Sequence, residues 1–280
     1  MRIRSGFIIR SAVIFSTIIL TLCLHLASGF ASGEQTSKPT LNQWMISRIK
    51  HITPDEALEF IFCADLHIPF DDRGTVSTIA KKANELKPAF ILLGGDTVQV
   101  GNPQNFKSLR KMLKKFNMPV ISAIGNHDTA FEDYSDQEEW TSRFGDTYYY
   151  FDVGSARIIA LNNANHVLPD EQLVFLDEVL KTELKKIIIM HRPVDYLNPL
   201  YSTPMEKGSE KFRELVEEAD VTAVLTGHEH HYAHYLINDV NYIVSGGAGG
   251  MLNIETKNNF HHFILVRVSR DKFDFKVVKI

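Results

Sequence analysis

From residue 58 onward, short apolar runs alternate with longer polar stretches in which apolar residues recur at helical spacing. The runs are nearly all apolar, a pattern typical of strands that are buried on both faces. The predicted strands are Leu58–Ala64, Ala89–Leu93, Pro119–Ile124, Arg157–Leu161, Lys186–Met190 and Val221–Leu225. The predicted helices are Thr75–Leu86, Gln104–Phe116, Asp170–Leu180 and Ser209–Glu218. This alternation predicts an α/β fold.

The pattern changes after Gly227, where closely spaced strands replace the alternation of strands and helices. Turn signals at Asn238-Asp239 and Arg270-Asp271 separate these strands. The strands predicted here are His234–Ile237, Tyr242–Val244, Phe263–Val268 and Phe273–Val278. We expect this last part of the chain to form an antiparallel addition to the α/β core.

The first residues differ from the rest of the chain. Arg2, Arg4 and Arg10 precede the uncharged apolar run Ser11–Ala27, and small residues follow that run. This order is typical of a secretory signal peptide, with cleavage expected after residue 29 or 31. An uncleaved signal anchor is the alternative, because the run approaches the roughly 20 residues that span a bilayer. We therefore expect an extracytoplasmic protein, periplasmic or secreted, which is held at a membrane only if this segment stays uncleaved.

These patterns divide the chain into three parts: residues 1–31 as signal peptide, 32–57 as a polar linker and N-terminal extension, and 58–280 as one domain. The 280 residues are 44% hydrophobic and 23% charged, which is enough for one sizeable core. The formal net charge of -4 provides no surplus of basic residues, so stable binding to nucleic acid is not expected. A small phosphorylated substrate remains possible, because metal ions can supply positive charge locally.

The chain has two cysteines, and Cys23 lies in the predicted signal peptide. Cys63 is then alone in the mature protein, so stability outside the cytoplasm must come from the core and not from an internal disulfide. Its apolar neighbours predict that Cys63 is a small buried residue of a strand and not a nucleophile.

Polar residues follow five of the predicted strands at their carboxyl ends. These segments are Asp65-Leu66-His67, Gly94-Gly95-Asp96, Gly125-Asn126-His127-Asp128, His191-Arg192-Pro193 and Thr226-Gly227-His228-Glu229-His230. Because the carboxyl ends of the strands of an open α/β sheet share one crevice, we expect the five segments to converge. Carboxylates and imidazoles without thiolates suit divalent metal ions, and there are more ligands than one ion can use.

Taken singly, the shorter motifs are weak signals. D-x-H is common by chance, and Gly-Asp after a strand is ordinary turn chemistry. Gly-Asn-His-Asp is more specific, because its polar groups gain nothing from packing. Gly-His-x-His places two imidazoles on one side of an extended segment. The occurrence of all five motifs after five apolar runs favours a functional site over a structural explanation.

In this order of motifs the chain resembles the calcineurin-like metallophosphoesterases, whose signature is D-x-H, G-D, G-N-H-D or G-N-H-E, a lone His and G-H-x-H. The resemblance covers roughly residues 58 to 280 and implies two packed mixed β-sheets flanked by helices. It implies a first metal ion on Asp65, His67 and His230, and a second on Asn126, His191 and His228. Asp96 would bridge the two ions, His127 would bind phosphate and act as general acid, and Asp128 would orient the ring of His127.

The resemblance further implies hydrolysis of phosphomonoesters or phosphodiesters by a hydroxide that bridges two divalent ions such as Mn, Fe or Zn. Purple acid phosphatases carry a Tyr three residues after the bridging Asp, whereas this chain has Gln99, so no tyrosinate-to-iron colour is expected. A metal-binding or scaffolding protein that kept the fold and lost turnover is the alternative. Such a protein should have gaps among the ligand positions, and this sequence has none.

Other residues leave two readings open. The stretch Gly246–Gly250 could let the backbone approach the site or form a plain loop, and Arg192 could contact phosphate or cap the end of a strand. Four further histidines are expected to be ordinary strand or surface residues, namely His231, His234, His261 and His262. Residues 129–146 and 195–208 follow ligand segments and are expected to form walls of the substrate pocket.

Overall fold

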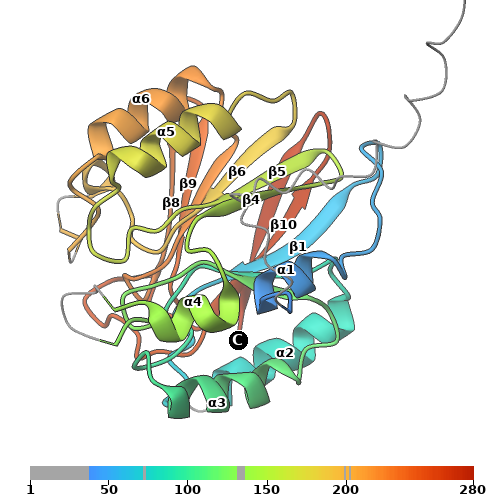
Figure 1. Cartoon of the computed structure of the whole chain (residues 1–280), viewed down its shortest axis with the longest axis vertical. Coiled ribbons are helices and arrows are strands. Elements are labelled where there is room, and N and C mark those ends of the chain that lie inside the picture. The colour runs from blue at the N-terminus through green and yellow to red at the C-terminus, as the bar shows by residue number, and fades with distance from the viewer. Residues whose placement is uncertain (1–37, 72–73, 131–135, 199, 202) are drawn as a thin grey trace, which may run out of the picture.

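The computed structural model describes residues 38–71, 74–130, 136–198, 200, 201 and 203–280 (Figure 1). The predicted signal peptide, residues 1–31, lies outside the described residues. The helices are α1 (Leu41–Ile46), α2 (Thr75–Leu86), α3 (Pro103–Leu113), α4 (Glu138–Phe144), α5 (Asp170–Val179) and α6 (Ser209–Glu218), with a 3₁₀ turn at Asp195–Leu197. The strands are β1 (Leu58–Cys63), β2 (Ile91–Leu93), β3 (Val120–Ser122), β4 (Tyr149–Val153), β5 (Ala156–Ala160), β6 (Lys185–Ile189), β7 (Ala223–Thr226), β8 (Tyr232–Ile237), β9 (Val240–Ser245), β10 (His262–Val268) and β11 (Phe273–Lys279).

The strands form two mixed sheets. The first has five strands in the order β11-β10-β1-β2-β3, and the second has six in the order β4-β5-β6-β7-β9-β8. Strands β1, β2 and β3 are parallel to one another, as are β5, β6, β7 and β9. The remaining neighbours pair antiparallel. This confirms the expected α/β architecture of two packed sheets with flanking helices.

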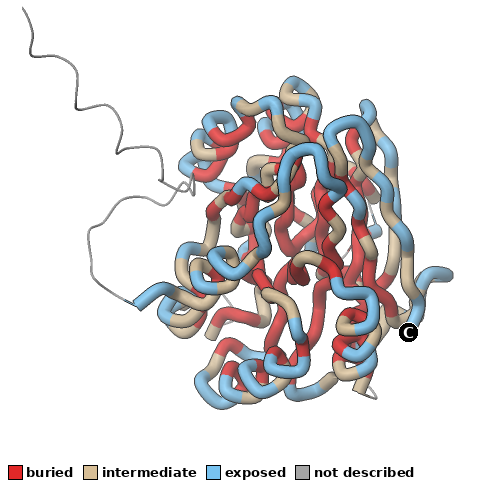
Figure 2. Tube along the Cα trace, turned by 90° about the vertical axis from the view of Figure 1, so that its right-hand side faces the viewer, coloured by how far each residue is buried: buried red, intermediate tan, exposed pale blue. Residues whose placement is uncertain are grey.

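The main core lies between the two sheets (Figure 2). Phe60 of β1 and Phe90 stack with ring centroids 5.0 Å apart, and Phe90 meets Phe151 of the second sheet edge-on at 5.9 Å. Alternate residues of β1, such as Ile61 and Cys63, point to the other face and pack under helices. Burial on both faces is the physical reason that this strand is almost entirely apolar.

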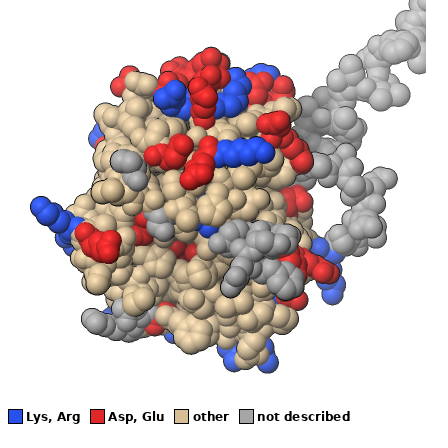
Figure 3. Space-filling view, turned by 90° about the vertical axis from the view of Figure 1, so that its left-hand side faces the viewer, with Lys and Arg blue, Asp and Glu red and all other residues tan. Residues whose placement is uncertain are grey.

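Helices cover the outer face of each sheet (Figure 1). Helices α2, α3 and α4 pack on the first sheet, and α5 and α6 pack on the second. The start of α3 follows a common capping rule: the side chain of Asn102 accepts a hydrogen bond from the Asn105 amide at 2.9 Å, and Pro103 occupies the first turn. Charged side chains gather over the α5 and α6 layer, at the top of Figure 3.

The segment expected to be a linker, residues 32–57, contains α1, which is joined to the domain. The buried side chain of Asn42 donates to the carbonyl of Ser122 at 2.9 Å and accepts from the amide of Ser122 at 3.0 Å. These two hydrogen bonds extend the edge of β3 much as another strand would. The contact of α1 with β3 could not be predicted from the sequence, because α1 is too short to show a helical pattern of apolar residues.

The last part of the chain is not a separate addition. Strands β8 and β9 extend the second sheet, with β9 parallel to β7, while β10 and β11 extend the first sheet through antiparallel pairing of β10 with β1. Strand β4 and helix α4 were not predicted from the sequence. Strand β4 is an edge strand in which Asp152 is exposed, so its hydrophobic run is interrupted. In the part of the chain that the structure describes, no helix is long and apolar enough to cross a membrane.

Candidate metal centre

The five polar segments meet at one end of the two sheets. Three follow β1, β2 and β3 of the first sheet, and two follow β6 and β7 of the second. Main-chain hydrogen bonds join these segments, from the Asp65 amide to the carbonyl of Gly95 at 3.1 Å and from the Gly227 amide to the carbonyl of His191 at 2.8 Å. The five segments therefore converge as expected. They do so where the carboxyl ends of strands from two packed sheets meet, and not along the crevice of one open sheet.

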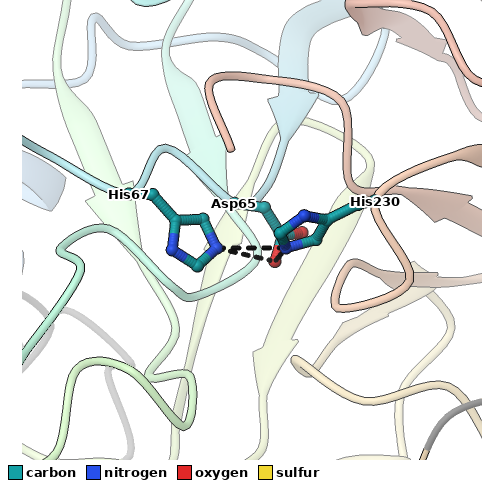
Figure 4. A group of neighbouring side chains, drawn as sticks. All are labelled: Asp65, His67 and His230. Atoms are coloured by element: carbon teal, nitrogen blue, oxygen red, sulfur yellow. Dashed lines mark hydrogen bonds and ion pairs between the residues drawn. The ribbon is translucent and has the colours of Figure 1, made fainter. Parts of the chain in front are cut away.

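Asp65, His67 and His230 form the first group of possible ligands (Figure 4). The Oδ1 atom of Asp65 lies 3.3 Å from Nε2 of His230 and 3.7 Å from Nε2 of His67. The two Nε2 atoms lie 3.1 Å apart. Although burial opposes charge on His230, the adjacent carboxylate of Asp65 raises the pKa of His230 to about 9. The same pairing lowers the pKa of Asp65 against the effect of its own burial.

The second group is formed by Asp96, His191 and His228. Nε2 of His191 lies 3.0 Å from the side-chain oxygen of Asn126 and 3.3 Å from Nδ1 of His228. Burial, together with the positive charges of His191 and Arg192, lowers the pKa of His228 to about 3. His228 is therefore neutral at physiological pH, as a metal-binding imidazole must be.

Asp96 lies between the two groups. Its Oδ2 atom is 3.6 Å from Nε2 of His67 on one side and 3.2 Å from Nε2 of His191 on the other. Its Oδ1 atom accepts a hydrogen bond from the amide of His127 at 2.8 Å. Burial opposes ionisation of Asp96, but the charge of His191 and the hydrogen bond from it lower the pKa of Asp96 below its ordinary value.

Each of three candidate ligand rings is held through its second nitrogen. Nδ1 of His67 lies 2.9 Å from the side-chain oxygen of Gln99, Nδ1 of His191 lies 2.9 Å from the carbonyl of Gly94, and Nδ1 of His230 lies 2.6 Å from the carbonyl of Met251. These contacts of Nδ1 direct Nε2 toward the centre, where it can bind a metal ion once it is deprotonated. A main-chain carbonyl belongs to every residue, so sequence could not identify these partners. The position of Gln99, three residues after Asp96, was the available signal.

The ring of His127 is held by the main chain of the loop after β2. Its Nδ1 atom lies 2.8 Å from the main-chain carbonyl of Gln99, while the carboxylate of Asp128 is directed elsewhere. One oxygen of Asp128 accepts from the amide and hydroxyl of Thr97 at 2.9 and 2.6 Å and from the amide of Val98 at 3.1 Å. The other accepts from the amide of Gly125 at 2.9 Å.

In this structure the donors to the carboxylate of Asp128 are Thr97, Val98 and Gly125, and the partner of Nδ1 of His127 is the carbonyl of Gln99, so the role of Asp128 in orienting His127 stays a prediction. Asp128 fastens the loop after β3 to the loop after β2. Burial and the charge of Asp96 raise the pKa of Asp128 to about 7, against the effect of the hydrogen bonds that Thr97 and Gly125 donate to it. The chain turns here so that the two adjacent side chains have different partners.

Arg192 does not simply cap a strand. Its buried guanidinium donates to the carbonyl of Ala164 at 2.9 Å and to the carbonyl of Thr203 at 2.7 Å. Its Nη1 atom also lies 2.7 Å from Nε2 of His228. Arg192 thus supports a candidate ligand from behind and joins the loops that surround it.

The backbone of the centre is strained. Asp65, His67, Asp96, His228 and His230 all have positive φ angles, between 49° and 70°. Non-glycine residues rarely adopt this conformation, and such residues cluster at functional sites, where the surrounding structure compensates for their cost. The sequence motifs gave no indication of it.

Glycines let the main chain pack directly against the ligand rings. A Cβ atom on Gly250 would lie 2.6 Å from Cδ2 of His67 and 2.9 Å from Cε1 of His230, so only glycine fits there. Of the two readings left open for the stretch Gly246–Gly250, close approach of the backbone to the site is the one that the structure supports.

These groups fit divalent metal ions. Oδ1 of Asp65 is buried and accepts no hydrogen bond, although it faces two imidazole nitrogens. Two opposed Nε2 atoms at 3.1 Å and a buried carboxylate oxygen without a donor are expected of a site in which a cation organises the ligands. In the described residues, the groups of His, Asp and Glu that could hold an ion all lie at this centre. His231, His234, His261 and His262 belong to none of these groups.

A cavity of about 410 Å³ borders the centre and is lined by His67, Phe70, Gln99, His127, His230, Gly250 and Met251. A larger groove of about 1110 Å³ lies at the opposite ends of β1, β2 and β3 and contains none of the candidate ligands. The smaller cavity, which borders the candidate ligands, is therefore the candidate substrate pocket. The two segments expected to form its walls, 129–146 and 195–208, contribute none of the described lining residues.

Comparison with known proteins agrees with this geometry. Residues 58–232 match the family described as calcineurin-like phosphoesterase. The serine/threonine-protein phosphatase CPPED1 of Mus musculus is 27% identical over 215 positions, covering 66% of this chain and 66% of that protein. A probable cyclic nucleotide phosphodiesterase of Moraxella catarrhalis is 26% identical over 204 positions, covering 64% of this chain and 74% of that protein. The chain thus spans just under two thirds of the length of the mouse relative.

A solved structure of a dimetal phosphatase from Danio rerio shares the fold, with a TM-score of 0.59 and 15% identity over 79% of this chain and 96% of that chain. This chain likewise has two packed sheets, with a cluster of carboxylates and imidazoles at the carboxyl ends of their strands. The chain belongs to the calcineurin-like phosphoesterase family.

Proposed function

We propose that this protein is an exported hydrolase of phosphomonoesters or phosphodiesters that works with two divalent metal ions. The position of Asp96 is the observation that carries the proposal. Its Oδ2 atom is within 3.6 Å of a ligand nitrogen in each of the two groups, as a carboxylate shared by two ions requires. When bound, two such ions would supply positive charge that polarises the phosphate. They would also lower the pKa of a bound water, so that hydroxide is available near neutral pH.

The ligands divide between the two positions. Asp65, His67 and His230 would hold one ion, and Asn126, His191 and His228 would hold the other, with Asp96 shared. The neutral oxygen of Asn126 adds no charge, so the second position stays the more electrophilic. The strained main chain and the hydrogen bonds on the second ring nitrogens fix these side chains before a substrate arrives.

His127 is the proposed general acid. Its Nδ1 atom is held by the carbonyl of Gln99 at 2.8 Å, which leaves Nε2 to donate a proton to the departing alcohol oxygen. Its ring lies edge-on to that of His67, with centroids 4.7 Å apart, so it stands beside the first group of ligands. The relatives bear the names of a phosphatase and a phosphodiesterase, which supports both phosphomonoesters and phosphodiesters as substrates.

Metal exchange and substitution of Asp96 test the proposal together. Chelation should abolish hydrolysis of a panel of phosphomonoesters and phosphodiesters, and addition of Mn²⁺ should restore it. Asp96→Asn should lose both bound ions in metal analysis, whereas His234→Asn, a change of an exposed histidine outside the centre, should retain them. Full activity of demonstrably metal-free protein would overturn the mechanism. Two tightly held ions in the Asp96→Asn variant would remove Asp96 as the shared ligand.

Export rests on the sequence of the first residues alone. The arginines before the apolar run Ser11–Ala27 and the small residues after it support a cleaved signal peptide. The native protein should begin near Phe30 or Ser32 and be found outside the cytoplasmic membrane. N-terminal sequencing decides this, since an intact Met1 in a membrane fraction would favour the uncleaved anchor.

A further inference from the structure

Among the residues that the structure describes, the lining of the cavity beside the metal centre combines polar side chains of the site with the apolar side chains of Phe70 and Met251, and includes no lysine, arginine, aspartate or glutamate. Phe70 and Met251 line it, with exposed fractions of 69% and 82%. Large apolar side chains at such exposure are unfavourable in water unless something covers them. Here they stand directly beside the candidate ligands His67 and His230.

Main-chain hydrogen bonds tie both apolar residues to the ligands. The amide of Phe70 donates to the carbonyl of His67 at 2.7 Å, and the carbonyl of Met251 accepts from Nδ1 of His230 at 2.6 Å. The amide of Gly250, next to Met251, donates to the carbonyl of Asp65 at 2.8 Å. The main chain at Phe70 and Met251 is therefore fixed relative to the first group of ligands.

The side of the centre on which the cavity opens decides which part of a substrate enters it. His127 lines the same cavity and, in the proposed function, protonates the departing alcohol oxygen. With the phosphate at the ligands, the alcohol portion of the ester must then lie on the His127 side, between Phe70 and Met251.

We propose that this cavity is a binding subsite for an apolar alcohol portion, so that the substrates are phosphoesters of alkyl or aromatic alcohols and not of sugars or other polyols. The inference rests on the proposed hydrolase function, in which water adds to phosphorus, the ester P–O bond breaks, and the alcohol oxygen takes its electron pair and a proton. A volume of about 410 Å³ accommodates a small apolar group.

A series of alkyl phosphates tests the subsite, because methyl, butyl and hexyl alcohols differ little in acidity and hence in leaving ability. With the metal-loaded full chain, kcat/KM should rise roughly fourfold for each added methylene until the cavity is filled. Phe70→Ser and Met251→Ser should flatten this rise of kcat/KM with alkyl chain length. Leu236→Ser, which alters an exposed residue of β8 outside the cavity, should keep the full rise.

Binding of alkylphosphonates, measured by calorimetry, gives a second readout that does not depend on turnover. Hexylphosphonate should bind more tightly than methylphosphonate to the wild-type protein, and this preference should be lost in the Phe70→Ser and Met251→Ser variants. Activity that does not depend on alkyl length, or that favours glycerol phosphate over hexyl phosphate, would overturn the subsite and leave the hydrolase function standing. Absence of hydrolysis of every ester in the presence of Mn²⁺ would instead remove the proposed function.

Discussion

The main-chain carbonyl of Gln99 holds Nδ1 of His127 at 2.8 Å. The side-chain oxygen of the same residue lies 2.9 Å from Nδ1 of His67. Gln99 thus orients a candidate ligand through its side chain and the proposed general acid through its backbone. Because a substitution changes only the side chain, the two functions can be separated experimentally.

Gln99→Ala should weaken metal binding about 10- to 100-fold, since the ring of His67 loses the acceptor that fixes its tautomer. Competition titration with a metal-sensitive dye measures this. Val100→Ala, at the exposed neighbouring position, should leave the affinity unchanged. The ratio of rates for alkyl and nitrophenyl esters should stay as in the wild type, because His127 keeps its backbone partner. Unchanged metal affinity in Gln99→Ala would show that this hydrogen bond does not support the ligand.

Asp128→Asn should destabilise the fold by about 2 kcal/mol, because the amide nitrogen of asparagine would face the amide of Gly125, which now donates to the carboxylate. Urea unfolding of the metal-free protein measures this loss.

His127→Ala should slow the hydrolysis of alkyl esters much more than that of nitrophenyl esters, whose leaving group needs no proton. Asp128→Asn should not slow the hydrolysis of alkyl esters more than that of nitrophenyl esters. If it did, Asp128 would act through the His127 ring after all.

His262 should make stability fall as the solution is acidified. Burial lowers the pKa of this histidine to about 4, and its ring is held by Ser245 and the carbonyl of Phe260. Between pH 6.5 and pH 4 the unfolded chain takes up a proton that the folded chain excludes. Stability is therefore lost as pH falls through this window, by about 3 kcal/mol at its lower end.

Urea unfolding of wild type and His262→Gln in the presence of a chelator, at several pH values, isolates this contribution. The variant lacks the titrating group, so its stability should decline less between pH 6.5 and pH 4. Parallel profiles for the two proteins would mean that His262 is not the group responsible.

Cys63 should be unreactive in the folded protein. Its side chain is buried, and this burial, together with the charge of Asp65, raises the pKa of the thiol to about 12. At pH 8 almost no thiolate is present, so alkylation should require unfolding. Peptide mapping after iodoacetamide treatment, with and without urea, distinguishes Cys63 from Cys23. Rapid labelling of Cys63 without urea would contradict the buried position.

Much of the fold could be predicted from local sequence patterns. The apolar runs located most of the strands, and helices α2 and α6 begin and end where the spacing of apolar residues predicted. This works because a strand buried on both faces must be apolar throughout. Edge strand β4 and the short helices α1 and α4 escaped detection, because their residues are only partly buried or too few to show a period.

The candidate ligands could also be named in advance, since Asp and His in ordered motifs after buried strands have little structural use. Their partners could not. Whether the ring of His127 meets Asp128 or the carbonyl of Gln99 depends on how the loops after β2 and β3 turn, and in this structure the partner of Nδ1 is the carbonyl of Gln99.

Residue types thus indicated a candidate metal centre, because only certain side chains bind metals or exchange protons. The tertiary structure decided which groups share the centre, since two sheets had to pack before their loops could meet. It also placed Phe70 and Met251 beside the ligands through main-chain hydrogen bonds, which any residue can form and no motif therefore records.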